Sequence, residues 1–232
     1  MQNKTKNIAI IPARGGSKRI PRKNIKNFLG KAIIAYSIEA ALASELFDEV
    51  MVSTDDKEIA DIAKQYGAKV PFFRSKGTAN DYAGLTDVII EVINEYKKQD
   101  QQFDHVCCLL ATAPFVEAKH LQEAFKKLED STFDTVFPVV RYAFPIQRAM
   151  QFEGENIKMI WSENMSQRSQ DLKPSFHDAG LFYWAKTKII LEQKKLWTDN
   201  TTAIEISEQT AQDIDTNEDW KIAELKYKLV NA

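Results

Sequence analysis

Short apolar runs alternate along the chain with segments in which apolar residues recur every three or four positions. Continuous runs of about five apolar residues predict strands buried on both faces of a sheet, and the wider spacing predicts amphipathic helices. The predicted strands are 8–12, 50–54, 106–110, 136–140 and 180–184, with one more near Ile204. The predicted helices are 32–43, 55–66 and 85–96, one around 121–128, and one from Asn217 onward. Because strands and helices alternate, we expect an α/β fold with a mostly parallel central sheet flanked by helices.

Local signals refine this outline. Asp55 is a predicted helix N-cap with Glu58 in the capping-box position, and Gly67 ends the same helix. Between residues 141 and 177 the periodicity is lost, which predicts an insertion with its own hairpin inside a single domain of residues 1–232. Ligands of open α/β sheets bind beyond the carboxyl ends of the strands, so we expect functional residues in the loops that follow them.

The composition is that of an ordinary globular protein, with 232 residues, 44% hydrophobic and 28% charged. It excludes a disordered, collagen-like or coiled-coil chain. Cys107 and Cys108 are adjacent in an apolar run, so they form neither a disulfide framework nor a CxxC metal pair, which favours a reducing compartment. No uncharged stretch reaches the roughly 18 apolar residues of a membrane span, and the run that Arg14 ends is too short for a signal peptide. We therefore expect a cytoplasmic protein without membrane contact.

Charge is distributed unevenly although the net charge is only −2. The first 38 residues hold nine Lys or Arg and no acid, so the remainder holds 22 bases and 33 acids. This asymmetry predicts a local anionic ligand. A nucleic-acid-binding surface would normally make the whole chain basic, so we do not expect a nucleic-acid partner, and an RNA-binding arm is kept only as an alternative.

The basic residues gather in the loop 13–24, directly after the first predicted strand. Its two glycines let a backbone turn bring N–H groups close to an anion, and its arginines and lysines supply full charges. Neither a GxxxxGK[ST] P-loop nor a GxGxxG fingerprint is present. A solvated basic turn is the alternative, but so many cations repel one another unless an anion holds them, which favours a polyphosphate ligand. The candidates for pairing with the charge of such a ligand are Arg14, Lys18 and Lys23, and the other candidates for holding it are Ala13, Gly15, Gly16, Ser17 and Asn24.

A pair of carboxylates stands near the other end of the sequence. Asp213 and Asp215 are two residues apart, so in an extended segment both point to one side while Ile214 points into the core. Mg²⁺ prefers one or two protein carboxylates together with substrate phosphates. The pair therefore predicts a Mg²⁺ site, and the alternative is a strand end followed by a helix cap at Thr216 or Asn217.

At this point the sequence resembles a known family. The stretch IPARGGSKRIPRKN (11–24) is similar to the signature of CMP-sialic acid synthetases and related nonulosonate cytidylyltransferases, and Ser53–Asp55, Arg74 and Asn80–Asp81 follow in the family's order. The resemblance implies a Rossmann-like nucleotide-diphospho-sugar transferase fold in which the basic loop holds the triphosphate of CTP and Arg74 belongs to the nucleotide site. It also implies that the aspartate pair binds Mg²⁺ and that the insertion contacts a partner subunit in a homodimer.

Later segments point to one branch of that family. Ala111–Phe115, Phe144–Arg148, Ser169–Leu172 and His177–Gly180 resemble the branch that activates pseudaminic acid for surface-glycan or flagellin glycosylation. Sialic acid synthetases usually carry QPTSP where this chain has Leu110–Pro114, so a glutamine that contacts the nucleotide or sugar is absent. The resemblance thus implies transfer of CMP from CTP to pseudaminic acid with release of pyrophosphate, and a sialic or legionaminic acid synthetase is the alternative.

A nonulosonic acid carries a carboxylate beside its anomeric carbon, which arginine suits geometrically. The candidate sugar-binding residues in the irregular region are Arg148, Arg168 and His177. The aromatic run 182–184 is expected to be mostly core, and His120 is expected on a helix surface without a role.

Two readings of other kinds compete with this one. A metal-dependent glycosyltransferase also uses an aspartate pair, but it would lack a basic loop after the first strand and would place the pair mid-chain. A nucleotide- or RNA-binding module without catalysis would bind the same ligands without turnover.

Overall fold

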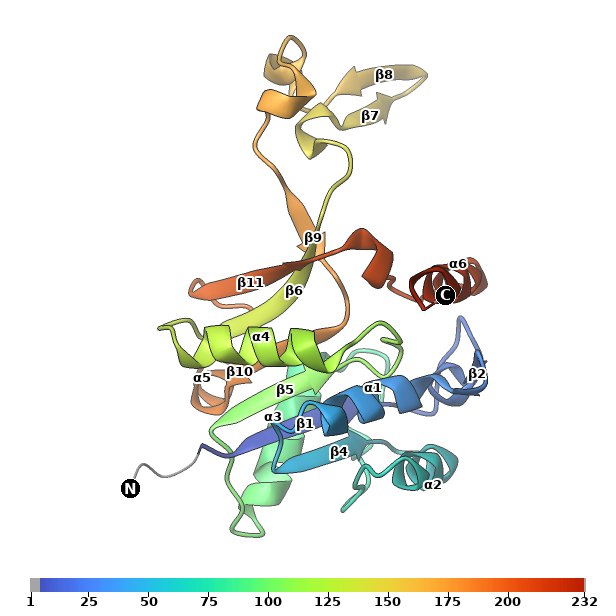
Figure 1. Ribbon diagram of the computed structural model, residues 1–232, viewed down its shortest axis with the longest axis vertical. Helices are drawn as coiled ribbons and strands as arrows, with labels where there is room; N and C mark the ends of the chain where they lie inside the picture. Colours follow the sequence, from blue (N-terminus) through green and yellow to red (C-terminus); the bar gives the residue numbers. More distant parts are fainter. Residues whose placement is uncertain (1–4, 232) are drawn as a thin grey trace.

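The computed structural model describes residues 5–231, and a seven-stranded sheet forms their centre (Figure 1). Six strands lie in the order β11-β6-β10-β5-β1-β4, and β9 pairs with β6. β4, β1 and β5 are parallel to one another, as β6 and β11 are, whereas β10 runs antiparallel to both of its neighbours and β9 antiparallel to β6. The bounds are β1 Asn7–Pro12, β4 Glu49–Ser53, β5 His105–Leu109, β6 Thr135–Arg141, β9 Phe176–Asp178, β10 Phe182–Lys186 and β11 Thr201–Ile206.

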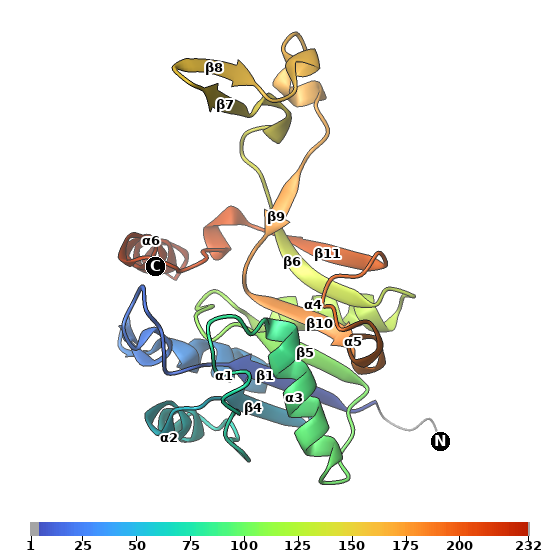
Figure 2. The ribbon, with the colours of Figure 1, turned by 180° about the vertical axis from the view of Figure 1, so that it is seen from behind.

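Helices cover both faces of this sheet. α1 and α4 lie in front of it in Figure 1, and α3 and α5 cover the opposite face in Figure 2. Along β1, Ile8 and Ile10 pack with the α3 side while Ala9 and Ile11 pack with the α1 side, as the alternation of side chains along a strand requires. The helices are α1 Ile33–Ala43, α2 Lys57–Gln65, α3 Leu85–Lys97, α4 Ala118–Glu129, α5 Thr187–Gln193 and α6 Asn217–Val230.

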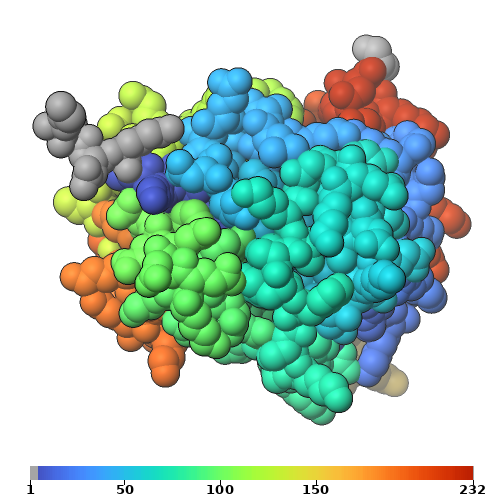
Figure 3. All heavy atoms as spheres, turned by 90° about the horizontal axis from the view of Figure 1, so that it is seen from below, coloured from blue at the N-terminus to red at the C-terminus, as the bar shows by residue number. Residues whose placement is uncertain are grey.

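Short elements connect this framework. A two-stranded hairpin of β2 (Asn27–Phe28) and β3 (Lys31–Ala32) leads into α1, and single 3₁₀ turns occupy Lys23–Ile25 and Glu208–Thr210. At the end of the molecule opposite the insertion, α2, α3 and their connecting segments, coloured teal to green, form most of the surface (Figure 3).

The insertion predicted for 141–177 is an arm that projects away from the sheet (Figure 1). Its base is the antiparallel pair β6–β9, and it contains the predicted hairpin, β7 (Met150–Glu153) and β8 (Asn156–Met159), with 3₁₀ turns at Ile146–Arg148, Ser162–Asn164 and Ser169–Asp171. Large apolar side chains remain exposed on it, including Phe152 at 76% and Met165 at 67%. Within residues 5–231, no helix has the length and apolar character needed to cross a bilayer.

Most predicted elements are confirmed, and the differences have local causes. Asp56, not Asp55, is the N-cap of α2, because its side chain accepts the hydrogen bond from the Ile59 N–H. The predicted strand 180–184 begins two residues later, because Gly180 has a positive φ of 65° and forms the turn from β9 into β10. His120 is on α4 as predicted, but it is buried rather than on the surface.

Candidate functional site

A cavity of about 500 Å³ opens at the carboxyl ends of β1 and β5. At this point of the sheet the chain continues from β1 to β4 on one side and from β5 toward β6 on the other, which is where open α/β sheets bind their ligands. The sequence predicts functional residues at this edge, in the loops that follow the strands. The cavity brings together two groups that are about 190 residues apart in the sequence, the basic loop after β1 and the aspartate pair before α6. The predicted residues that line it are Arg14, Ser17, Lys18, Lys23, Asn24, Arg74, Asp213 and Asp215.

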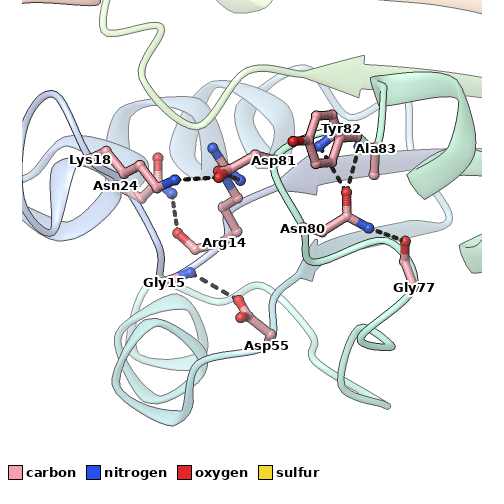
Figure 4. Close-up of polar contacts among 10 residues, drawn as sticks. All are labelled: Arg14, Gly15, Lys18, Asn24, Asp55, Gly77, Asn80, Asp81, Tyr82 and Ala83. Carbon is pink, nitrogen blue, oxygen red and sulfur yellow. Dashed lines mark hydrogen bonds and ion pairs between the residues drawn. The ribbon is translucent and has the colours of Figure 1, made fainter.

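The basic loop is fixed to the body by buried contacts. Ile20 is almost completely buried, and the Asn24 side chain donates a hydrogen bond to the Arg14 carbonyl at 2.9 Å. The Gly15 N–H donates to Asp55 Oδ1 at 2.9 Å, so the predicted helix cap instead holds the loop (Figure 4). These contacts fix the backbone of the loop, while the side chains of Lys18 and Arg19 remain largely exposed.

The two glycines of the loop differ in what they allow. Neither has a positive φ, but the chain bends at Gly15 and the Ser17 N–H donates to the Gly15 carbonyl at 3.1 Å, so the predicted turn is present without a left-handed conformation. A Cβ on Gly15 would lie 2.7 Å from Asp56 Oδ2 and 3.0 Å from Asp56 Cβ, so that position requires glycine because of close approach to α2. A Cβ on Gly16 would meet no atom within 4 Å.

Carboxylates of the same chain pair with each cation of the loop. Arg14 and Lys18 both contact Asp81, at 2.6 and 2.5 Å. Arg19 contacts Asp215 at 2.7 Å. The anions that hold these cations together are therefore carboxylates of the fold itself, so their mutual repulsion alone does not require a polyphosphate, which stays a prediction.

Arg22 forms the outer edge of the loop and has a left-handed backbone, with φ at 57°. Its guanidinium donates to both Asp56 oxygens, at 2.5 and 2.9 Å, and to Glu58. This hydrogen bonding from Arg22 lowers the pKa of Asp56 to about 2. Glu58 was predicted in the capping-box position of α2, but it pairs with Arg22 of the loop instead.

The aspartate pair has the predicted geometry. Ile214 is fully buried, while Asp213 and Asp215 both line the cavity. Lys23 connects the pair to the basic loop, since its Nζ donates to the Ile214 carbonyl at 2.6 Å and lies 3.5 Å from Asp215 Oδ1. Thr216 caps α6 in a capping box with Asp219, so the helix cap considered as the alternative coexists with the site.

The residues at the pair fit a divalent cation. The pKa of Asp213 is raised, first by the loss of water around the carboxyl in the cleft and then by repulsion from Asp215, which a bound cation would relieve. Among residues 5–231, no cluster of three or more His, Cys, Asp or Glu is arranged for metal binding. The protein would therefore supply two carboxylates and leave the other positions to phosphate and water, as Mg²⁺ prefers.

Arg74 forms part of the cavity wall from a buried position. Its Nε donates to Ser53 Oγ at 3.1 Å and its Nη2 to the Ser53 carbonyl at 2.5 Å, which fixes the guanidinium at the end of β4. Burial lowers its pKa, although an arginine remains charged at neutral pH.

The three predicted sugar-binding residues do not line this cavity within one chain. Arg148 donates to the Gln167 carbonyl, and Arg168 pairs with Asp171 at 2.7 Å, both within the arm. His177 lies on β9 at the base of the arm, with its ring beside Tyr142. Their role stays a prediction that depends on what the arm contacts.

Sequence reasoning missed several residues of the cavity. Arg19 is not among the predicted site residues, because a loop has no periodicity from which the side chains that line a cavity could be identified. The segment after Arg74 contributes Thr78, Asn80, Asp81 and the start of α3, and only the family order of Asn80–Asp81 signalled it. Thr112, from the segment noted as typical of one branch, also lines the wall.

Comparisons with known proteins show the family and the fold of the chain. A profile of the family described as "Cytidylyltransferase" matches residues 8–219. The chain is 44% identical to the pseudaminic acid cytidylyltransferase of Campylobacter jejuni over 97% of both chains, and 33% identical to the CMP-N,N'-diacetyllegionaminic acid synthase of Legionella pneumophila over 94% of both. A solved CMP:2-keto-3-deoxy-manno-octonic acid synthetase complexed with CTP superposes with a TM-score of 0.72 at 17% identity, covering 98% of this chain and 99% of that one. At that identity the structural likeness shows the fold alone, and it confirms the predicted one.

Proposed function

Because the chain belongs to the cytidylyltransferase family and is a CTP-using nucleotidyltransferase, we propose that it transfers CMP from CTP to a nonulosonic acid and releases pyrophosphate. The observation that carries the proposal is the meeting of the basic loop and the aspartate pair in one cavity, where Lys23 lies 3.5 Å from Asp215. We propose pseudaminic acid as the sugar, because the 44% identity to the Campylobacter enzyme extends over the whole of both chains.

The chain's own residues would act mainly by positioning and charge neutralisation, which is what phosphoryl transfer requires. The anomeric hydroxyl of the sugar attacks the α-phosphorus in line, and pyrophosphate leaves. Arg14, Lys18 and Lys23 stabilise the charge that develops on the triphosphate and on the leaving group. Mg²⁺ held by Asp213 and Asp215 would neutralise charge on the α-phosphate.

Other residues would hold the nucleotide in place. The segment 13–16 would lie beside the phosphates, and two bonds support this by fixing its backbone, the one from Asn24 to the Arg14 carbonyl and the one from the Gly15 N–H to Asp55. Ser17 and Asn24 would orient the nucleotide from the loop, and Arg74 would do so from the end of β4.

We further propose that the arm reaches a second copy of the chain, which makes the protein a homodimer. The exposed apolar side chains of β7 and β8 support this, because they have no cover in their own chain. In that arrangement Arg148, Arg168 and His177 would recognise the sugar carboxylate at the partner's cavity. We place the protein in the cytoplasm, where CTP is available.

The test is an incubation of the protein with CTP, Mg²⁺ and pseudaminic, legionaminic or sialic acid, scored for pyrophosphate and CMP-sugar. We expect turnover with pseudaminic acid above the others, and loss of turnover when EDTA removes the metal. CTP binding without pyrophosphate release for any sugar would favour the non-catalytic reading. Sedimentation at the mass of one 26.5 kDa chain would refute the homodimer.

A further inference from the structure

The segment between Arg74 and α3 presents one carboxylate to the basic loop. Asn80 shapes this segment, because its Nδ2 donates to the Gly77 carbonyl at 2.6 Å and its Oδ1 accepts from the N–H groups of Tyr82 and Ala83 at 2.8 and 3.0 Å (Figure 4). Asp81 therefore points into the cavity rather than into solvent alone.

The contacts of Asp81 have the form of a phosphate site. Oδ1 accepts from Arg14 Nη1 at 2.6 Å and Oδ2 accepts from Lys18 Nζ at 2.5 Å, so each oxygen takes a different cation. These hydrogen bonds, the one from Lys18 first, lower the pKa of Asp81, which keeps it ionised at neutral pH. The two cations assigned to the triphosphate are thus already bridged by an anion of the same chain.

We propose that Asp81 is a positioning residue that acts as an internal substitute for a substrate phosphate. It holds Arg14 and Lys18 at the cavity before nucleotide binds, and the triphosphate then replaces the carboxylate on the same two donors. This inference rests on the proposed function, because it takes those cations to be the triphosphate ligands.

Because a ligand must displace the Asp81 carboxylate, the site should bind ligands with several phosphate charges in preference to ligands with a single phosphate. A carboxylate carries one negative charge, so a group with several charges, such as the β,γ-diphosphate part of CTP or pyrophosphate, displaces it more readily than a ligand with a single phosphate. When pyrophosphate leaves, Asp81 recovers Arg14 and Lys18. Its carboxylate then competes with rebinding of the product pyrophosphate.

The test compares three ligands by titration calorimetry in the presence of Mg²⁺ and without sugar: inorganic pyrophosphate, CTP and CMP. Nucleotide must break the ion pairs of Asp81 with Arg14 and Lys18 before it can bind, and each exposed pair of this kind contributes little. We therefore expect Asp81→Asn to bind pyrophosphate and CTP about twofold to tenfold more tightly. CMP affinity should stay unchanged. In turnover, the gain is expected in KM for CTP rather than in kcat.

Two further variants separate this role from a general charge effect. Asp61→Asn removes the same charge from the exposed surface of α2, away from the cavity, and should leave the affinity for pyrophosphate unchanged. Asp81→Glu keeps a carboxylate and should bring the affinity back toward that of the unsubstituted protein.

Weaker binding of pyrophosphate or CTP by Asp81→Asn would overturn the proposal, because Asp81 would then act within the loaded complex. An equal gain in Asp61→Asn would also overturn it. If the unsubstituted protein binds CTP and turns it over but the variant gains nothing, only the role of Asp81 fails. If the unsubstituted protein binds neither CTP nor pyrophosphate, the proposed function fails as well.

Discussion

Lys23 and Arg19 contact the same carboxylate from environments that differ sharply, which allows a matched pair of substitutions. The Lys23 side chain is only 18% exposed, and it bonds to the Ile214 carbonyl at 2.6 Å besides facing Asp215. The Arg19 side chain is 66% exposed and contacts Asp215 alone. Water and salt screen the second contact far more than the first.

We expect Lys23→Met to lower kcat about a hundredfold, or about 3 kcal/mol, the usual loss when one preorganised charge is removed from a transition state. Arg19→Met should lower it by no more than about fivefold, since an exposed pair contributes at most about 1 kcal/mol. The lost bond from Lys23 to Ile214 should cost about 1.5 kcal/mol of folding free energy. For a chain of this length that lowers Tm by about 3–6 °C and leaves the protein folded at the assay temperature.

The assay is pyrophosphate release at saturating CTP, Mg²⁺ and sugar, with Tm measured on the same preparations. Lys64→Met on the exposed face of α2 serves as a control for a charge lost elsewhere. Turnover of Lys23→Met within about threefold of the unsubstituted protein would refute its role in neutralising charge. Equal losses for Lys23→Met and Arg19→Met would refute the argument that burial decides the difference.

Three other substitutions test how the site is supported. Gly15→Ala should lose about 1–3 kcal/mol of stability because its Cβ meets Asp56 at 2.7 Å, while Gly16→Ala should change stability by less than about 0.5 kcal/mol; similar melting temperatures would contradict this. Asp56→Asn keeps a helix cap but loses the charge that pairs with Arg22. Because the pKa of Asp56 is lowered, the stability advantage of Asp56 should be complete above pH 3.8 and vanish as pH falls through about 2, and a constant difference in unfolding midpoint would count against the ion pair. Ile214→Ala should cost about 2–5 kcal/mol by denaturant unfolding and also reduce turnover, and unchanged turnover would show that this residue does not hold the aspartate pair in place.

The sequence was sufficient wherever a local pattern carried the information. The continuous apolar run of β1 is typical of a strand buried on both faces, and the period near 3.6 in α3 follows from helix geometry, so these elements and the buried face of α3 could be predicted without contacts. The aspartate pair was recognisable for the same reason, since the buried Ile214 between two polar residues fixes both side-chain directions. The break in periodicity after residue 140 likewise located the arm.

Only the tertiary structure decided which charges meet. Asp81 pairs with Arg14 across 67 residues, and Asp215 pairs with Arg19 across 196, because the sheet order places their loops at one edge. No periodicity exists in a loop, so the sequence could not tell that Gly15 is required by the approach of α2. Helices and strands have a regular geometry, so the spacing of apolar residues in the sequence is enough to predict them. The pairing of distant loops depends instead on how the strands are ordered in space.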